Sequence, residues 1–214
     1  MKSKKILFVV NRFHPEVGGA ETNTYYQAKL LSQDHDVTVF TPKRDDYPDK
    51  ESIDGIKIIR AKDYFNRNDY YPNLRGNTLC LGLIKEIVFG DYDLVQCFPA
   101  INYNVMIARL FSWIRMIPCI LCCFDFLNYA QILKVQGEIE DDILEKTRLS
   151  PWRKFFLKKF DYIFSISQKE LNYMKKFNSK IDFSPVPVLL DEFEKEVDSP
   201  REKYGVSKDD FVFL

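Results

Sequence analysis

The chain has 214 residues, of which 46% are hydrophobic and 29% are charged, and its formal net charge is zero. This composition is typical of a globular protein with a sizeable core, and it gives no general reason to expect nucleic-acid binding. No apolar run approaches the ~20 residues that a membrane-spanning helix requires. The apolar run at residues 6–10 is too short for a signal peptide, so we expect a cytoplasmic protein whose first strand begins here.

Short apolar runs alternate with helical patterns along the whole chain. Strands are predicted at residues 5–10, 36–41, 56–61, 92–98, 118–124, 161–167 and 180–188. Helices are predicted at residues 20–33, 79–90, 102–116, 137–160 (broken near 150–151) and 168–177. Such alternation favours parallel pairing with helices on both sheet faces. We expect one doubly wound α/β domain with a parallel sheet of about seven strands, followed by a different segment.

The cysteines do not indicate a metal site. The chain has five of them, and Cys119 and Cys122 have C-x-x-C spacing. A zinc site would need further ligands, but no second pair exists and only two histidines occur. We expect no metal and interpret the cysteines as buried, reduced thiols in a core strand.

The stretch HPEVGGAE (14–21) lies between the first predicted strand and the first predicted helix. Its adjacent glycines, Gly18 and Gly19, could simply form a turn. Alternatively, they let a phosphate or sugar approach the helix N-terminus, where N–H groups and the helix dipole favour an anion. A β-branched residue at position 19 would then disfavour the positive φ expected there and fill the space of the phosphate. The G-x-G-x-x-G spacing and an acidic end to the second strand are both missing, which counts against NAD.

Several motifs resemble family-4 glycosyltransferases of the GT-B fold. The first is F-x-P-x-x-G-G-A-E, from Phe13 to Glu21. The others are LLSQDHDVTVFTP (30–42), FDYIFSISQKEL (160–171), PVPVLLDEFE (185–194) and REKYGVSKDDFVFL (201–214). The resemblance covers nearly all of the chain, and the order and spacing of the motifs carry it.

The resemblance implies two Rossmann-like domains that face each other across a cleft. Residues 1–190 would be the N-terminal, acceptor-binding half, and residues 191–214 the linker and the start of a C-terminal donor domain. Such enzymes move a sugar from a nucleotide-sugar to a glycan or lipid-linked acceptor, as in polysaccharide biosynthesis, retain the anomeric configuration and need no metal. Because the chain stops at Leu214, we expect a truncated, split or excised hexosyltransferase-like enzyme that is inactive alone.

The resemblance also implies candidate site residues. Gly18 and Gly19 would approach the donor phosphates. Asp125 is the candidate catalytic residue; it follows the fifth strand, where the family often has a histidine, and it could instead be a cap or turn residue. The predicted acceptor-binding residues are Arg12, His14, Glu21, Tyr70 and Asn102. Glu21 could equally stabilise the helix dipole, and His14 could be an ordinary loop residue.

The segment PWRKFFLKKF (151–160) carries four cations, and its Trp152, Phe155, Phe156 and Phe160 fall on one helical stripe. This stripe either packs on the sheet or forms a basic amphipathic surface that contacts anionic lipid at the inner face of the membrane. Two other functions remain open. One is a non-catalytic binding subunit whose partner polypeptide supplies the donor domain, and the other is an unrelated nucleotide-binding or regulatory α/β domain.

Overall fold

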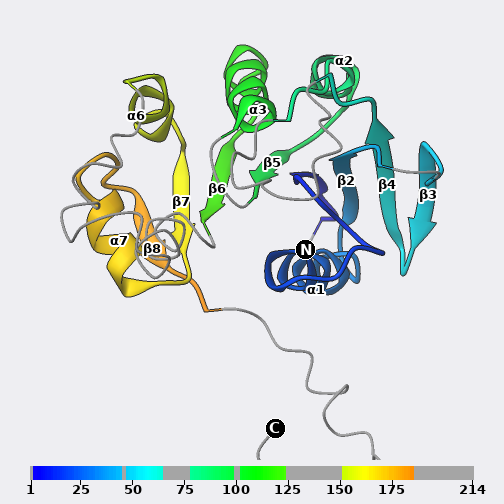
Figure 1. Cartoon of the computed structure of the whole chain (residues 1–214), viewed down its shortest axis with the longest axis horizontal. Helices are drawn as coiled ribbons and strands as arrows, with labels where there is room; N and C mark the ends of the chain where they lie inside the picture. The colour runs from blue at the N-terminus through cyan, green and yellow to red at the C-terminus, as the bar shows by residue number, and fades with distance from the viewer. Residues whose placement is uncertain (1, 45–46, 65–77, 99–101, 124–150, 186–214) are drawn as a thin grey trace, which may run out of the picture.

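The computed structural model describes residues 2–44, 47–64, 78–98, 102–123 and 151–185. These residues form one eight-stranded sheet with helices packed on it (Figure 1). The strands are β1 (Lys5–Val9), β2 (Asp36–Pro42), β3 (Lys50–Ile53), β4 (Ile56–Ala61), β5 (Leu94–Cys97), β6 (Cys119–Cys123), β7 (Tyr162–Ser165) and β8 (Ile181–Phe183). The helices are α1 (Gly19–Leu31), α2 (Gly82–Phe89), α3 (Tyr103–Ile114), α6 (Pro151–Leu157) and α7 (Gln168–Met174).

The strand order is β3-β4-β2-β1-β5-β6-β7-β8, and every pairing is parallel except that of β3 with β4. The order reverses at β1, which pairs with β2 on one side and with β5 on the other. Loops that leave β1 and β5 at their carboxyl ends therefore diverge, and doubly wound sheets bind their ligands at such a point. The loop that contains Gly18 and Gly19 leaves β1 here.

The Rossmann-like, doubly wound prediction is confirmed, and all seven predicted strands are present. The eighth strand, β3, was missed. It forms a hairpin with β4 through Asp54 and Gly55, both with positive φ (49° and 78°). An Asp-Gly pair between apolar residues is a strong hairpin signal, so the sequence did contain the evidence for this edge strand.

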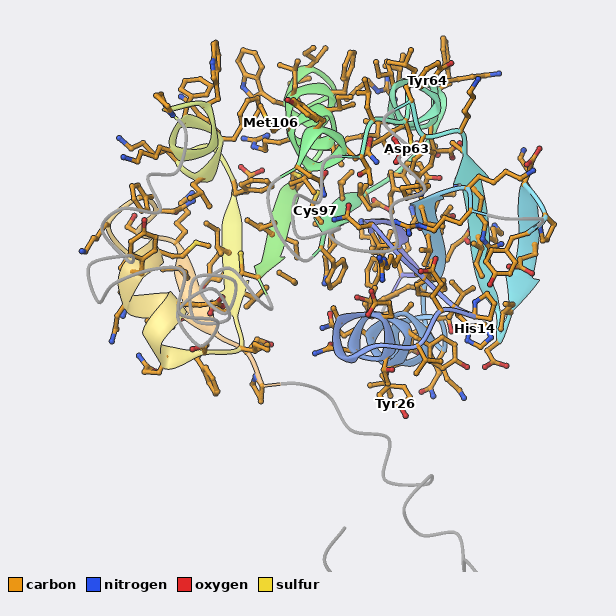
Figure 2. The ribbon with its side chains drawn as sticks, in the orientation of Figure 1. His14, Tyr26, Asp63, Tyr64, Cys97 and Met106 are labelled. Atoms are coloured by element: carbon orange, nitrogen blue, oxygen red, sulfur yellow. The ribbon has the colours of Figure 1, made fainter. Side chains whose placement is uncertain are left out.

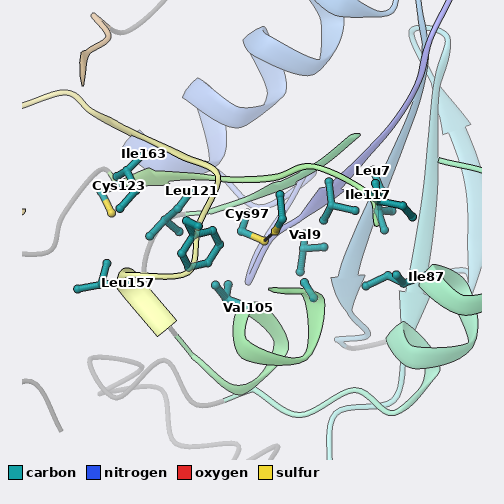
Figure 3. Packing of buried hydrophobic residues seen from close by; sticks show 14 of the residues in the cluster. Leu7, Val9, Ile87, Cys97, Val105, Ile117, Leu121, Cys123, Leu157 and Ile163 are labelled. Atoms are coloured by element: carbon teal, nitrogen blue, oxygen red, sulfur yellow. Dashed lines mark hydrogen bonds between the residues drawn. The ribbon is translucent and has the colours of Figure 1, made fainter. Parts of the chain in front are cut away.

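The core forms two clusters because successive residues of a strand point to opposite faces of the sheet. In β1, Leu7 and Val9 join the cluster that contains buried residues of α2 and α3, whereas Ile6 and Phe8 join the cluster that contains Ala28 of α1. Figure 3 shows the first cluster, with cysteine sulfurs among its aliphatic side chains. All five cysteines are buried and free, as predicted, but Cys80 precedes α2 and does not lie in a strand.

One of the two expectations for residues 151–160, that their aromatic residues form one helical stripe packed on the sheet, is wrong. Leu157 and Phe160 are buried, but Trp152 and Phe155 are exposed. The reason is that α6 ends at Leu157. Phe160 therefore lies beyond the helix, in the turn before β7, and does not share a helical face with the other aromatic residues.

Some predictions fall on residues that the structure does not describe. These are Tyr70, Asp125, the helix over 137–150 and the domain boundary at residue 190. They stay predictions. None of the described helices is both long enough and apolar enough to cross a membrane.

Candidate functional site

The loop that follows β1 is held at three points. Phe13 is buried in the cluster under α1. Glu16 lies between two arginines, with 3.6 Å from its carboxylate oxygens to Nε of Arg12 and to Nε of Arg44. At the third point, Arg60 of β4 donates from Nη2 to the carbonyl oxygen of His14 over 2.7 Å. These contacts give the loop a defined path from the end of β1 to the start of α1.

Arg60 is a positioning residue that the sequence analysis missed. Its side chain is only 2% exposed, it pairs with Glu51 of β3, and its guanidinium lies 5.2 Å from the ring centre of Tyr47. The signal was the alternation along β4, because Arg60 has the same strand parity as the buried Ile56 and Ile58. A charged residue at an inward position of a strand indicates a buried contact.

Gly18 is the residue that precedes α1, and it makes no side-chain cap hydrogen bond. Its backbone is extended, with φ −170° and ψ 170°. Among the described glycines, only Gly55 has a positive φ. The expectation of a positive φ at Gly19 is therefore wrong, since the chain enters this helix from extended backbone that any residue can adopt.

The two glycines differ in what surrounds them. A Cβ on Gly18 would collide with Oε2 of Glu21, so the carboxylate of Glu21 lies against this glycine. Among the residues that the structure describes, a Cβ on Gly19 would meet no atom within 4 Å. Gly18 thus accommodates a side chain of the same helix, whereas the space in front of Gly19 is open.

The ring of His14, which is labelled in Figure 2, stacks on Tyr25 of α1, with 5.5 Å between ring centres and 27° between planes. Tyr25 donates its hydroxyl to the carboxylate of Asp54, in the turn between β3 and β4. Burial, followed by this hydrogen bond, raises the pKa of Tyr25 above its ordinary value. His14 is therefore fixed both by its ring and, through Arg60, by its backbone.

A second helix, α3, begins beside the same edge of the sheet. Its first turn is capped by Asn102, whose Oδ1 accepts from the backbone N–H of Val105 over 2.9 Å. Nδ2 of Asn102 donates to Oδ1 of Asn11, just after β1, over 2.5 Å. Oδ1 of Asn11 also accepts from Thr78, and Thr78 accepts from Asn104 of α3. This polar chain ties α3 to the end of β1.

The structure thus brings most of the predicted site residues together at one end of the sheet. Arg12, His14, Gly18, Gly19 and Glu21 lie in one continuous segment. Asn102 is joined to this segment through Asn11 but is only 3% exposed, and both ends of its amide are occupied.

The structure also contains a cavity that lies away from this segment. This cavity of about 410 Å³ is lined by Lys5 and Asp36, which begin β1 and β2, so it opens at the opposite end of these strands. None of the predicted site residues that the structure describes lines it. Within the described ranges, no three His, Cys, Asp or Glu side chains come together as a metal site would require.

Two solved glycosyltransferases of the GT-B fold resemble this chain. Sucrose-phosphate synthase from Thermosynechococcus elongatus aligns with a TM-score of 0.62 and 16% identity, covering 96% of this chain and 53% of that one. HepE from Anabaena, in complex with UDP-glucose, aligns with a TM-score of 0.56 and 13% identity, covering 94% of this chain and 50% of the other. The chain therefore spans about half the length of these structures. At such identities the likeness concerns the fold.

A search of curated protein sequences finds no match. The model of Glycosyltransferase Family 4 matches residues 17–189, which include both glycines of the loop, the capped start of α3 and strands β2 to β8. Because this match covers most of the 214 residues, the chain belongs to Glycosyltransferase Family 4.

Proposed function

We propose that this chain is the acceptor-side half of a retaining glycosyltransferase. It would move a sugar, a hexose in our proposal, from a nucleotide-sugar to a glycan or lipid-linked acceptor, as in polysaccharide biosynthesis. The observation that carries the proposal is the open space in front of Gly19, at the uncapped start of α1. Donor binding and turnover would need a second domain opposite this edge, on the same polypeptide or on another.

The geometry at Gly19 favours ligand approach over a turn. A turn that needs glycine would show a positive φ, and neither glycine of the loop has one. A glycine in extended or helical backbone, with nothing within 4 Å of its missing Cβ, is not required by packing either. The remaining explanation for Gly19 is that it gives a ligand access to the first N–H groups of the helix, where a phosphate is stabilised by the helix dipole.

The proposed donor is a nucleoside-diphosphate sugar. The family and the fold support sugar transfer in general, and HepE, which shares the fold, is solved with UDP-glucose. In our proposal the diphosphate or the sugar of the donor approaches Gly19 across the cleft. His14 and Arg12 lie on the loop that leads to this glycine, and we propose that they contact the acceptor beside it.

The remaining roles are proposed from the sequence. Asp125 would be catalytic, and Tyr70 and Glu21 would contact the acceptor, whereas both ends of the Asn102 amide already have partners within the chain. We also propose that transfer needs no divalent metal and that the protein acts in the cytoplasm, since five buried, free thiols suit a reducing compartment. Undiminished transfer in EDTA and the anomer of the product, read by proton NMR, test the metal and the stereochemistry.

A chimaera tests the proposed function without a known acceptor. The C-terminal half of HepE is fused after residue 185, and UDP release from UDP-glucose is followed, with water as the acceptor. Intact HepE is the positive control, and the isolated halves are the background. We expect UDP release from the fusion that exceeds the sum of both halves and falls when Gly19 is changed to Val.

The folded state of every preparation is checked by circular dichroism. Measurable UDP release by the isolated 214-residue chain would contradict the proposal that this chain is only the acceptor-side half. Release by the fusion that equals the sum of the halves, while acceptor sugars bind this chain, would instead indicate a binding subunit.

A further inference from the structure

Helix α3 carries large apolar residues on its exposed side in addition to those it buries in the core. Asn104, Arg109 and Ser112 are buried, whereas the exposed side presents large apolar residues at helical spacing. These are Tyr103, Leu110, Trp113 and Ile114. A helix that only covers a sheet buries its apolar stripe, as α3 does with Val105 and Ala108, and presents polar residues to the outside, which α3 does not.

Two of the buried polar residues of α3, Asn104 and Arg109, have partners that explain their position. Oδ1 of Asn104 accepts from the backbone N–H of Cys80 over 2.7 Å. Arg109 donates from Nε to the carbonyl oxygen of Lys159 and lies 3.9 Å from the carboxylate of Asp161. These contacts bind α3 to the segments that flank α2 and α6, and they leave its outward apolar side without a role in the core.

Helix α6 continues the exposed apolar surface. Figure 1 shows α2, α3 and α6 on the same side of the sheet, and Figure 2 shows side chains projecting outward from all three. Trp152 of α6 is 69% exposed and Trp113 of α3 is 67% exposed, and Phe155 is exposed as well. These are the two tryptophans of the chain. Tryptophan is amphipathic and is enriched where an apolar phase meets water.

Most charged residues in these helices are basic, and Asp161, which follows residues 151–160, lies beside the buried Arg109. In residues 81–90, 102–117 and 151–160, Glu86 is the only acidic residue, and its carboxylate accepts a hydrogen bond from Tyr92 over 2.5 Å. The exposed or half-buried cations of these segments are Lys85, Arg115, Lys154, Lys158 and Lys159. Nζ of Lys159 lies 5.4 Å from the ring centre of Phe155, so cation and aromatic ring share one patch.

We propose that this surface, named here the α3–α6 face and centred on Tyr103, Leu110, Trp113, Trp152 and Phe155, binds membranes that contain anionic lipids. The aromatic rings would enter the interface while the surrounding cations contact the lipid phosphates. The sequence pattern indicated a lipid-contacting surface at residues 151–160 alone, and α3 extends it to a second helix. The inference does not depend on sugar transfer.

The charge pattern favours a lipid surface over a second copy of this chain. A symmetric dimer through the α3–α6 face would bring the same patch from two subunits together and place cations against cations. An anionic lipid surface offers opposite charge to every one of these lysines and arginines. Each basic residue near such a surface contributes about 1 kcal/mol, or roughly a fivefold change in affinity.

Vesicle binding by the full chain tests the proposal. The probes are phosphatidylcholine vesicles with and without phosphatidylglycerol, and binding is read by co-sedimentation and by the tryptophan emission maximum. We expect binding that requires phosphatidylglycerol, shifts the emission to shorter wavelength and weakens at ~1 M salt, where screening is nearly complete. Equal binding to both kinds of vesicle, or no binding to either, would overturn the proposal.

Matched variants distinguish binding through the α3–α6 face from general electrostatic attraction between the chain and anionic vesicles. Lys154→Gln with Lys158→Gln should weaken binding about tenfold or more, whereas Lys175→Gln with Lys176→Gln, at the end of α7, should change it less than twofold. Trp113→Ser with Trp152→Ser should also abolish co-sedimentation, with the circular dichroism spectrum unchanged because both side chains are exposed. Equal losses for the two lysine pairs, or a concentration-dependent dimer that protects the tryptophans from acrylamide, would contradict it.

Discussion

Helices α1 and α3 both begin where a central parallel strand ends, but their first turns are completed differently. The start of α3 is closed by its own chain, because Asn102 caps it and is in turn bonded to Asn11. The start of α1 is preceded by Gly18, which has no side chain to cap it, and Gly19 faces open space. Two neighbouring strands, β1 and β5, thus lead to one capped and one uncapped helix.

This difference indicates that the two helix starts have different roles, one in stability and one in ligand binding. Helix N-terminal N–H groups need a partner, which a side chain, water or a ligand can provide. At α3 the protein supplies that partner itself. At α1 the loop is anchored firmly, through Phe13, Glu16 and the carbonyl of His14, yet the helix start it leads to carries no side-chain cap. We interpret the first as a structural helix start and the second as the site of the donor.

The largest expected effect is at Gly19 in the fusion with a donor domain. Gly19→Val should lower transfer by about 100-fold, since a side chain there displaces a reacting group by an ångström or more. Gly19→Ala is the matched control for folding, because alanine at a compatible helical position raises stability by about 0.4–1 kcal/mol. A graded loss of UDP release, valine more than alanine, with melting temperatures that do not fall, supports the ligand interpretation. Activity that follows the folded fraction would mean that the glycine serves the turn.

The next largest effect is expected at Asn102, which caps α3. Asn102→Ala should lower the free energy of unfolding by about 1 kcal/mol, measured by urea denaturation, because the first turn of α3 loses its cap. Asn102→Asp keeps an oxygen for the N–H of Val105 and should recover part of that loss. If Asn102 instead binds the acceptor, as the sequence analysis predicted, both variants would raise the acceptor KM in the fusion while stability changed little.

The smallest effect is at Gly18. Gly18→Ala should lower the free energy of unfolding by less than about 1 kcal/mol, because only the mobile end of the Glu21 side chain has to move and alanine caps a helix poorly. In a Glu21→Ala background the same substitution should cost less, and a double-mutant cycle measures the difference. A coupling of zero would show that the contact between Gly18 and Glu21 does not constrain the loop.

Much of the fold could be predicted because local patterns decide it. Alternating apolar runs placed β1, β2 and β4, and the last of these coincides with its prediction over residues 56–61. What could not be read locally depends on partners distant in sequence. Arg60 holds a backbone carbonyl 46 residues earlier in the chain, and Asn102 meets Asn11 across 91 residues.

The candidate site was predicted unevenly for the same reason. The position of the loop after β1 follows from topology, so Gly18 and Gly19 could be placed at the sheet edge from the pattern alone. Their backbone angles could not, because an uncapped helix entered from extended backbone leaves no trace in the sequence. The aromatic residues of α6 were read as one stripe because the end of that helix at Leu157 was not foreseen.

The central claim is that the start of α1 receives the donor while the start of α3 does not. It is tested most directly by amide NMR of the fusion protein, labelled with nitrogen-15, during titration with UDP-glucose. We predict saturable shifts of the amide signals of Gly18 and Gly19, with the amide of Val105, bonded to its cap at 2.9 Å, unchanged. Saturation of the donor site with no shift at either glycine, or an equal shift at Val105, would contradict the account.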